Sequence, residues 1–289
     1  MWLFYCLLGT FISGFTAIAM KKCSNNEPKI IVVQGLLIYC LLAISICLLT
    51  ETRYINMLNI KDMIYILPAT IFQIVGFYCA IVSTKFGKVS IIAPIKKARV
   101  VVVFLLGIII LHESCSFLQL ILSILLVTLS VVLVWEKDSK NIDSVLARKA
   151  AIYAYGFAIF NGIYGFLNKI YVTHFDDGLY VLFTNCITMI LILSIYCLIT
   201  NNKKYLNINK VNNKKYLLLY GLFDVFYGVF NRLSLETGNV SVISVIETSS
   251  IIVTVIASRI ILKEKLSWKK YAIIMIMFLC VFMLALIKT

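Results

Sequence analysis

Charged residues are scarce in this sequence: Asp, Glu, Lys and Arg make up only 14% of its 289 residues, whereas apolar residues make up 62%. A water-soluble domain contains about 25% charged and about 45–50% apolar residues. So few polar groups cannot cover the surface of a protein in water. The composition therefore excludes a water-soluble class and predicts a multi-pass protein of the cell membrane.

Catalytic and metal-binding patterns are also missing. The chain has only two histidines, His112 and His174, and its nine cysteines form no CxxC pair. Isolated cysteines in apolar runs usually act as small hydrophobic residues. There is no HExxH, GxSxG or P-loop motif. These absences argue against an enzyme, and they predict that the protein holds no metal and no cofactor.

The net charge of +14 comes largely from lysines in short loops between apolar runs. This placement indicates contact with the faces of a bilayer and not with nucleic acid.

The long apolar runs predict an all-α membrane protein with ten transmembrane helices, because about 20 residues are needed to cross the hydrocarbon core. The first run lacks a basic leading segment and a cleavage site, which favours a span over a signal peptide. Linkers are short, so no separate extramembrane domain is expected. The predicted spans are Trp2–Met20, Ile30–Thr50, Met63–Val82, Ile91–Leu111, Leu118–Trp135, Ala150–Tyr171, Gly178–Thr200, Tyr216–Leu233, Val240–Leu262 and Tyr271–Ile287.

Basic residues are concentrated on one side of these spans. The loops that follow odd-numbered helices hold nearly all of the loop lysines, and the opposite side has only Arg53, Lys61 and Lys288. Because cytoplasmic loops carry the excess of Lys and Arg, the pattern predicts cytoplasmic odd-numbered loops and both termini outside.

The sequence repeats itself at an offset of 151 residues. The segment that starts at Gly87 and ends at Glu113 recurs from Gly238 to Glu264, and Phe72-Gln73 matches Phe223-Asp224. This predicts two five-helix repeats, 1–135 and 150–289, with 136–149 as a linker. Since five is odd, the second repeat is inverted in the membrane. Inverted repeats are typical of secondary transporters, which bind substrate near the midplane between the repeats.

The two halves, with fourth and ninth helices that end in Leu111-His-Glu113 and Leu262-Lys-Glu264, resemble the drug/metabolite transporter superfamily of the ten-helix EamA type. The resemblance covers essentially the whole chain. It implies a carrier of amino acids, nucleobases, sugars or other metabolites, often an exporter, with a central cavity lined by both halves.

Three features depart from that family. Pro94 in the fourth helix matches Val245, so the ninth helix is expected to lack its break. The first helix has no acidic residue, which argues against proton-coupled export of lipophilic cations. Family members usually keep both termini in the cytoplasm, and the basic loops contradict this topology.

Charged residues inside spans are candidate functional residues, because they are costly in hydrocarbon. Lys96, Lys97 and Arg99 lie in the fourth helix, and the repeat places Glu247 opposite Lys96 and Thr248 opposite Lys97. Lys96 and Arg99 share a face, whereas Lys97 is expected to snorkel to the headgroups. We expect Lys96 and Glu247 to form a coupled pair in binding or gating. The alternatives are that the lysines snorkel, or that the pair only serves packing.

Polar side chains on three further helices predict the rest of the binding site. Asp224 and Tyr227 share a face of the eighth helix, Asn161 and Tyr164 one of the sixth, and Gln73 lies in the third. Aromatic rings with amides suit a modest polar organic substrate. Asp224 near mid-helix could carry a coupling proton. Interfacial anchoring accounts for Arg232, Lys169 and Arg259, and Glu113 and Glu264 are expected to cap the helices that follow them.

The sequence as a whole predicts a secondary transporter for a small polar or zwitterionic, amino acid-like metabolite. Lys96 or Arg99 would bind its carboxylate, and Glu247 or Asp224 its amine. Anionic metabolites are the alternative substrates. An intramembrane enzyme lacks its catalytic residues, and a sensor or scaffold would not explain the repeat.

Overall fold

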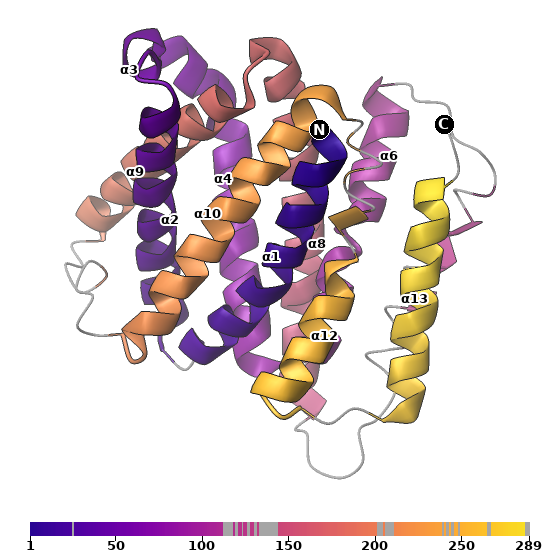
Figure 1. Cartoon of the computed structure of the whole chain (residues 1–289). Helices are drawn as coiled ribbons and strands as arrows, with labels where there is room; N and C mark the ends of the chain where they lie inside the picture. The colour runs from indigo at the N-terminus through magenta and orange to yellow at the C-terminus, as the bar shows by residue number, and fades with distance from the viewer. Residues whose placement is uncertain are drawn as a thin grey trace.

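The protein is a bundle of α-helices that cross the molecule in both directions (Figure 1). The computed structural model describes all residues except 25, 112–117, 119–120, 123, 126–127, 130–131, 133–143, 201–204, 206–210, 239, 241–242, 244–245, 248, 265–266 and 287–289. The helices are α1 (Trp2–Cys23), α2 (Pro28–Thr50), α3 (Tyr54–Met57), α4 (Ile60–Phe86), α5 (Val89–Lys97), α6 (Arg99–Leu111), α8 (Ser144–Phe175), α9 (Gly178–Ile199), α10 (Lys214–Thr237), α12 (Ser250–Ile261) and α13 (Trp268–Leu286).

Local sequence sets several helix ends. Pro28 occupies the first turn of α2, where a missing N–H removes no helical hydrogen bond. The Asn59 side chain caps α4 by accepting from Lys61 N at 3.1 Å, and the Asp177 side chain caps α9 by accepting from Tyr180 N at 2.9 Å. Both capping residues lie on short connections, which start the helices sharply.

Each predicted span other than Leu118–Trp135 overlaps a helix of the structure. Within the described residues, α1, α2, α4, α8 and α9 are long and apolar enough to cross a membrane. The sixth helix is longer than expected, because α8 begins at Ser144 inside the predicted linker. The fifth predicted span, Leu118–Trp135, lies mostly outside the described residues.

Two spans are broken rather than continuous. At Ala98 the backbone N–H donates to Ile95 O at 3.0 Å, three residues back, and this turn separates α5 from α6. At Ser249 the N–H donates to Ile246 O at 3.0 Å, and α12 starts one residue later. Ala98 and Ser249 are 151 residues apart, so the breaks are equivalent. The expectation of an unbroken ninth helix was wrong, because a tightened backbone turn makes the break without proline.

The two halves run in opposite directions. At one face, Lys85 Nζ at the end of α4 donates to Asn26 O at 3.0 Å, and Asn26 Nδ2 donates to Asn212 O, just before α10, at 3.1 Å. We call this the lysine-rich face. At the opposite face, Glu236 near the end of α10 accepts from Gly178 N at 3.0 Å. Thus α4 ends where its repeat mate α10 begins, which confirms two inverted repeats.

The first helix of each half packs on the other half. In Figure 1, α1 runs beside α10, and α1 also contacts α12. A Cβ added at Gly14 of α1 would lie 2.5 Å from Val253 Cγ1, and one added at Gly162 of α8 would lie 2.7 Å from Val102 Cβ. Small residues allow such close helix packing in membranes. The two contacts are equivalent, because Val102 and Val253 are repeat mates. Gly14 therefore corresponds to Gly162, an offset of 148 residues between α1 and α8.

Candidate functional site: a charged cavity between the two halves

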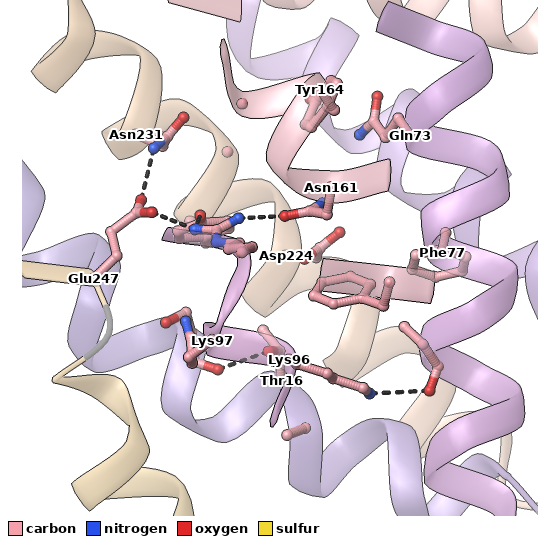
Figure 2. Close-up of a pocket in the computed structure, with 18 of the residues that line it drawn as sticks. Thr16, Gln73, Phe77, Lys96, Lys97, Asn161, Tyr164, Asp224, Asn231 and Glu247 are labelled. Atoms are coloured by element: carbon pink, nitrogen blue, oxygen red, sulfur yellow. Dashed lines mark hydrogen bonds and ion pairs between the residues drawn. The ribbon is translucent and has the colours of Figure 1, made fainter. Parts of the chain in front are cut away.

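A cavity of about 160 Å³ lies between the two halves, next to both helix breaks. Residues of α1, α4, α5, α6, α8, α10 and α12 line it, so each half contributes to its wall. Figure 2 shows its labelled polar side chains converging from different helices. A cavity of about 150 Å³ holds a molecule the size of benzene, so this cavity fits a small metabolite and not a drug-sized compound.

Arg99, the first residue of α6, links the halves across the cavity. Its guanidinium donates to Asn161 Oδ1 on α8, to Tyr227 Oη on α10 at 2.8 Å, and to Glu247 Oε2. The Arg99 and Glu247 side chains are 11% and 4% exposed. Glu247 Oε1 also accepts from Asn231 Nδ2 at 2.6 Å. This buried ion pair has the additional hydrogen bonds that charges need away from water.

The partner of Glu247 therefore differs from the one expected. Lys96 was predicted to pair with Glu247, but Lys96 Nζ donates to Ala80 O at 2.9 Å and to Thr84 Oγ1 at 2.7 Å. The reason lies in the repeat. Lys96 reaches position 80 of its own half, and Glu247 reaches Asn231, the mate of Ala80, in the other half. Repeat mates occupy equivalent places in two halves and need not touch.

Lys97 was expected to snorkel to the headgroups, but it faces the cavity. It lines the cavity together with Thr16 on α1 (Figure 2). Within the described part of the chain, no hydrogen bond or salt bridge to its ammonium is present. Among the described residues, Lys97 is thus a lysine of the cavity without a salt bridge.

The repeat mates Gln73 and Asp224 both line the cavity but differ in their partners. Gln73 Oε1 accepts from Asn185 Nδ2 at 2.8 Å, and Asn185 Oδ1 accepts from Thr70 Oγ1 at 2.7 Å. Asp224 lies beside Tyr220 and has no salt bridge to any described residue. The neutral mate is held by Asn185, whereas the acidic mate has a hydrogen bond from Tyr220 and no salt bridge among the described residues.

Most of the predicted site is brought together in this cavity. Thr248 lies outside the described residues. Tyr164, though it lines the cavity, is engaged by the arginine Arg232. The predicted residues that line the cavity are Gln73, Lys96, Arg99, Asn161, Tyr164, Asp224, Tyr227 and Glu247.

Sequence reasoning misplaced Arg232, which was expected to anchor at the interface. Its side chain is among the most buried of the protein, 1% exposed, and lines the cavity. Nη2 donates to Tyr164 Oη at 2.7 Å. Helical spacing could have found it, because Arg232 follows Asp224 by two turns and so shares its face. Asn168, on the same polar face of α8 as Asn161 and Tyr164, is 2% exposed and also lines the cavity.

Two other charged residues have structural roles that differ from those predicted. Lys169 Nζ donates to Leu235 O at 2.8 Å and Gly238 O at 3.0 Å, so it caps the end of α10 rather than anchoring at the interface. The Glu264 carboxylate accepts from the N–H groups of Val89 and Ser90, each at 2.9 Å. It therefore caps α5 in the other half, not the helix that follows it. Glu113 lies outside the described residues.

The lining carries more positive than negative groups. Lys96, Lys97, Arg99 and Arg232 face Asp224 and Glu247. Among the described residues, no cluster of His, Cys, Asp and Glu could hold a metal ion. The chemistry available here is the binding of a charged organic molecule.

Comparison with known proteins agrees with this architecture. The model of the EamA-like transporter family matches twice, over residues 1–135 and 148–286. No curated protein matches the sequence. Among solved structures, the chain is similar to a protein in a crystal structure, with a TM-score of 0.68 and 9% identity. That likeness covers 98% of this chain and 96% of the other, and at such low identity it establishes the fold alone.

Proposed function

The chain belongs to the EamA-like transporter family, and we propose that it carries a small zwitterionic, amino acid-like metabolite across the cell membrane by alternating access. Family membership establishes a multi-pass membrane transporter rather than an enzyme. The nature of the substrate is our inference from the cavity.

The observation that carries this proposal is an acid and a base of the cavity, Asp224 and Lys97, that have no salt bridge to any described residue. Arg99 and Glu247 neutralise one another, and Lys96 is bound by Ala80 and Thr84. Asp224 and Lys97 remain, together with Arg232, whose guanidinium donates to Tyr164 Oη. A substrate with an ammonium and a carboxylate group would satisfy Asp224 and Lys97, through charge-assisted hydrogen bonds.

Size and position support the same substrate. A cavity of about 160 Å³ suits a molecule of amino acid size. Tyr227, Phe77 and Phe157 line it, which gives an apolar surface beside the charged groups. Broken helices at the repeat interface are the usual place for a transporter's substrate.

Counterflow in proteoliposomes tests the proposal. We expect radiolabelled amino acids to exchange, and Lys97→Met and Asp224→Asn each to reduce the exchange strongly. Lys29→Met and Asp176→Asn are matched controls, because both residues are exposed and outside the cavity. Asn also tolerates the left-handed backbone at Asp176, where φ is 52°. Absence of exchange with every amino acid would refute the proposal.

Anionic metabolites are a second candidate, favoured by the four cations and two acids of the lining. A substrate without an amine has no use for the Asp224 carboxylate. For such a substrate, Asp224→Asn should increase exchange by removing a repulsive charge. The sign of the Asp224→Asn effect therefore separates the two candidates.

The basic loops lead us to propose that the lysine-rich face is cytoplasmic and that both termini are outside. An impermeant cysteine reagent should then fail to label a cysteine placed in the loop 201–215 in intact cells. A C-terminal tag should be accessible from outside. Labelling of the loop would reverse the orientation.

A further inference from the structure

Arg232 is a buried cation that forms no salt bridge with any described residue, although its charge interacts with Asp224 on the same face of α10. Within the described residues its guanidinium contacts only neutral acceptors, Tyr164 Oη at 2.7 Å and Gly228 O at 3.4 Å, and its Nε has no partner. No salt bridge reaches it from any described residue. Buried charges in proteins are normally paired, because an unpaired one loses its hydration without compensation. Arg232 therefore has no anion at ion-pair distance among the described residues.

Asn168 lies near Arg232 and also has an unsatisfied polar atom. Its Oδ1 is buried without a hydrogen bond, and its side chain is 2% exposed. On α8 it follows Tyr164, the partner of Arg232, by one turn. The next residue, Lys169, reaches Leu235 on α10, which places Asn168 along the same stretch of α10 as Arg232. Both side chains line the cavity.

We propose that Arg232 and Asn168 form a second anion-binding subsite of the cavity, and that the substrate is an acidic amino acid. This inference rests on the proposed function. Asp224 binds the amine and Lys97 the α-carboxylate, while Arg232 binds the side-chain carboxylate. Asn168 turns its amide nitrogen toward the same carboxylate.

Three of the four charges that remain in the cavity match this substrate. Arg99 and Glu247 cancel, which leaves Lys96, Lys97, Arg232 and Asp224. The two carboxylates and the ammonium of an acidic amino acid pair with Lys97, Arg232 and Asp224. Lys96 keeps its hydrogen bonds to Ala80 O and Thr84 Oγ1. A neutral amino acid would leave Arg232 without a counter-charge.

Competition in the counterflow assay tests the inference, with aspartate and glutamate compared with asparagine and glutamine. The amides have the same size and lack only the second charge. We expect the wild-type protein to prefer the acids by about tenfold or more, and R232Q to lose this preference. R232K keeps the charge and should retain part of the preference. K29M, outside the cavity, should retain all of it.

N168D provides a variant that keeps Arg232 and gives it a permanent carboxylate. We expect this variant to fold, because the new acid pairs with a buried cation, and to lose the preference for acidic substrates. If R232Q does not fold, N168D decides the question alone. Replacement of chloride by gluconate is a further arm, because an inorganic anion could occupy the same subsite.

The outcomes separate the two proposals. Exchange of neutral amino acids without a preference for acids would overturn the subsite and leave the proposed function intact. Neutral exchange that requires chloride and loses this requirement in N168D would also overturn it, in favour of a bound ion. No exchange with any amino acid would refute the proposed function itself.

Discussion

The two halves of the transporter share a backbone plan but differ in the charges that they bring to the cavity. Ala98 and Ser249 break equivalent spans, and Gly14 and Gly162 make equivalent close contacts. In the cavity, however, Lys96 of the first half stands where the second has Glu247, and Gln73 where it has Asp224. The comparison teaches that the repeated backbone positions the site, and that divergence of a few side chains gives it an acid side and a base side.

The largest effect should come from the ion pair that joins the halves. Arg99→Met or Glu247→Gln leaves a buried charge alone and should lower the free energy of unfolding by about 3–5 kcal/mol. The double variant should recover much of that loss. Thermal unfolding in detergent measures the effect.

A second cycle, Lys96→Met with Glu247→Gln, provides the control. Lys96 and Glu247 are held by different residues, so we expect their effects on stability to be additive. Strong coupling in this second cycle, with none in the first, would contradict the observed pairing.

Equivalent glycines should have equivalent effects. Gly14→Ala and Gly162→Ala each place a methyl group against Val253 or Val102, and overpacking of this kind costs about 1–3 kcal/mol. Val253→Ala should rescue the first variant and Val102→Ala the second. Gly165→Ala, where the nearest atom would be 3.8 Å away, is the control. A large effect at one glycine only would break the symmetry of the two halves.

Two lysine caps should show a smaller effect. Lys21 Nζ donates to Thr84 O at 2.7 Å and Gly87 O at 2.8 Å, just as Lys169 does to Leu235 O and Gly238 O. Lys21→Met and Lys169→Met should each lower stability by about 1 kcal/mol. Unfolding curves of the two variants in detergent would show whether the two caps contribute equally to stability.

The pH dependence of substrate exchange should come from the second half, which has Asp224 where the first half has Gln73. The Asp224 carboxylate binds an amine only when it is ionised, so acid should weaken substrate binding. Asp224→Asn should remove this pH dependence, whereas the exposed Asp176→Asn should keep it. Counterflow rates between pH 5 and 8 measure both. An unchanged pH profile in Asp224→Asn would exclude Asp224 as the titrating group.

Sequence reasoning found the spans and the repeat because both depend on patterns that survive divergence: the length of the apolar runs and the Gly-x-Val-Ser segment that starts at Gly87 and recurs at Gly238. It also brought Arg99, Asp224 and Tyr227 to one cavity, because helical spacing places them on inward faces. Pairing was beyond its reach. Lys96 and Glu247 were joined because they are repeat mates, although an inverted repeat places mates in different halves.

Other errors arose where local sequence carries no signal. The break at Ser249 depends on backbone hydrogen bonds that no residue type announces. The equivalence of Lys21 and Lys169 runs at an offset of 148, outside the register of the main repeat. Arg232 was assigned to the interface because it lies near the end of its helix. It nevertheless lies one helical turn after Gly228, on the buried face of the helix.

The exchange of first helices between the halves has a consequence for biosynthesis. Thr254 Oγ1 donates to Gly14 O at 3.1 Å, and Tyr5 stacks on Phe230 at 6.2 Å between ring centres. During synthesis, α1 is thus made long before its main neighbours, α10 and α12. Until α10 and α12 are made, the face of α1 that contains Gly14 has no helix packed against it. A nascent chain stopped before α10 would leave this face exposed to quality-control proteases.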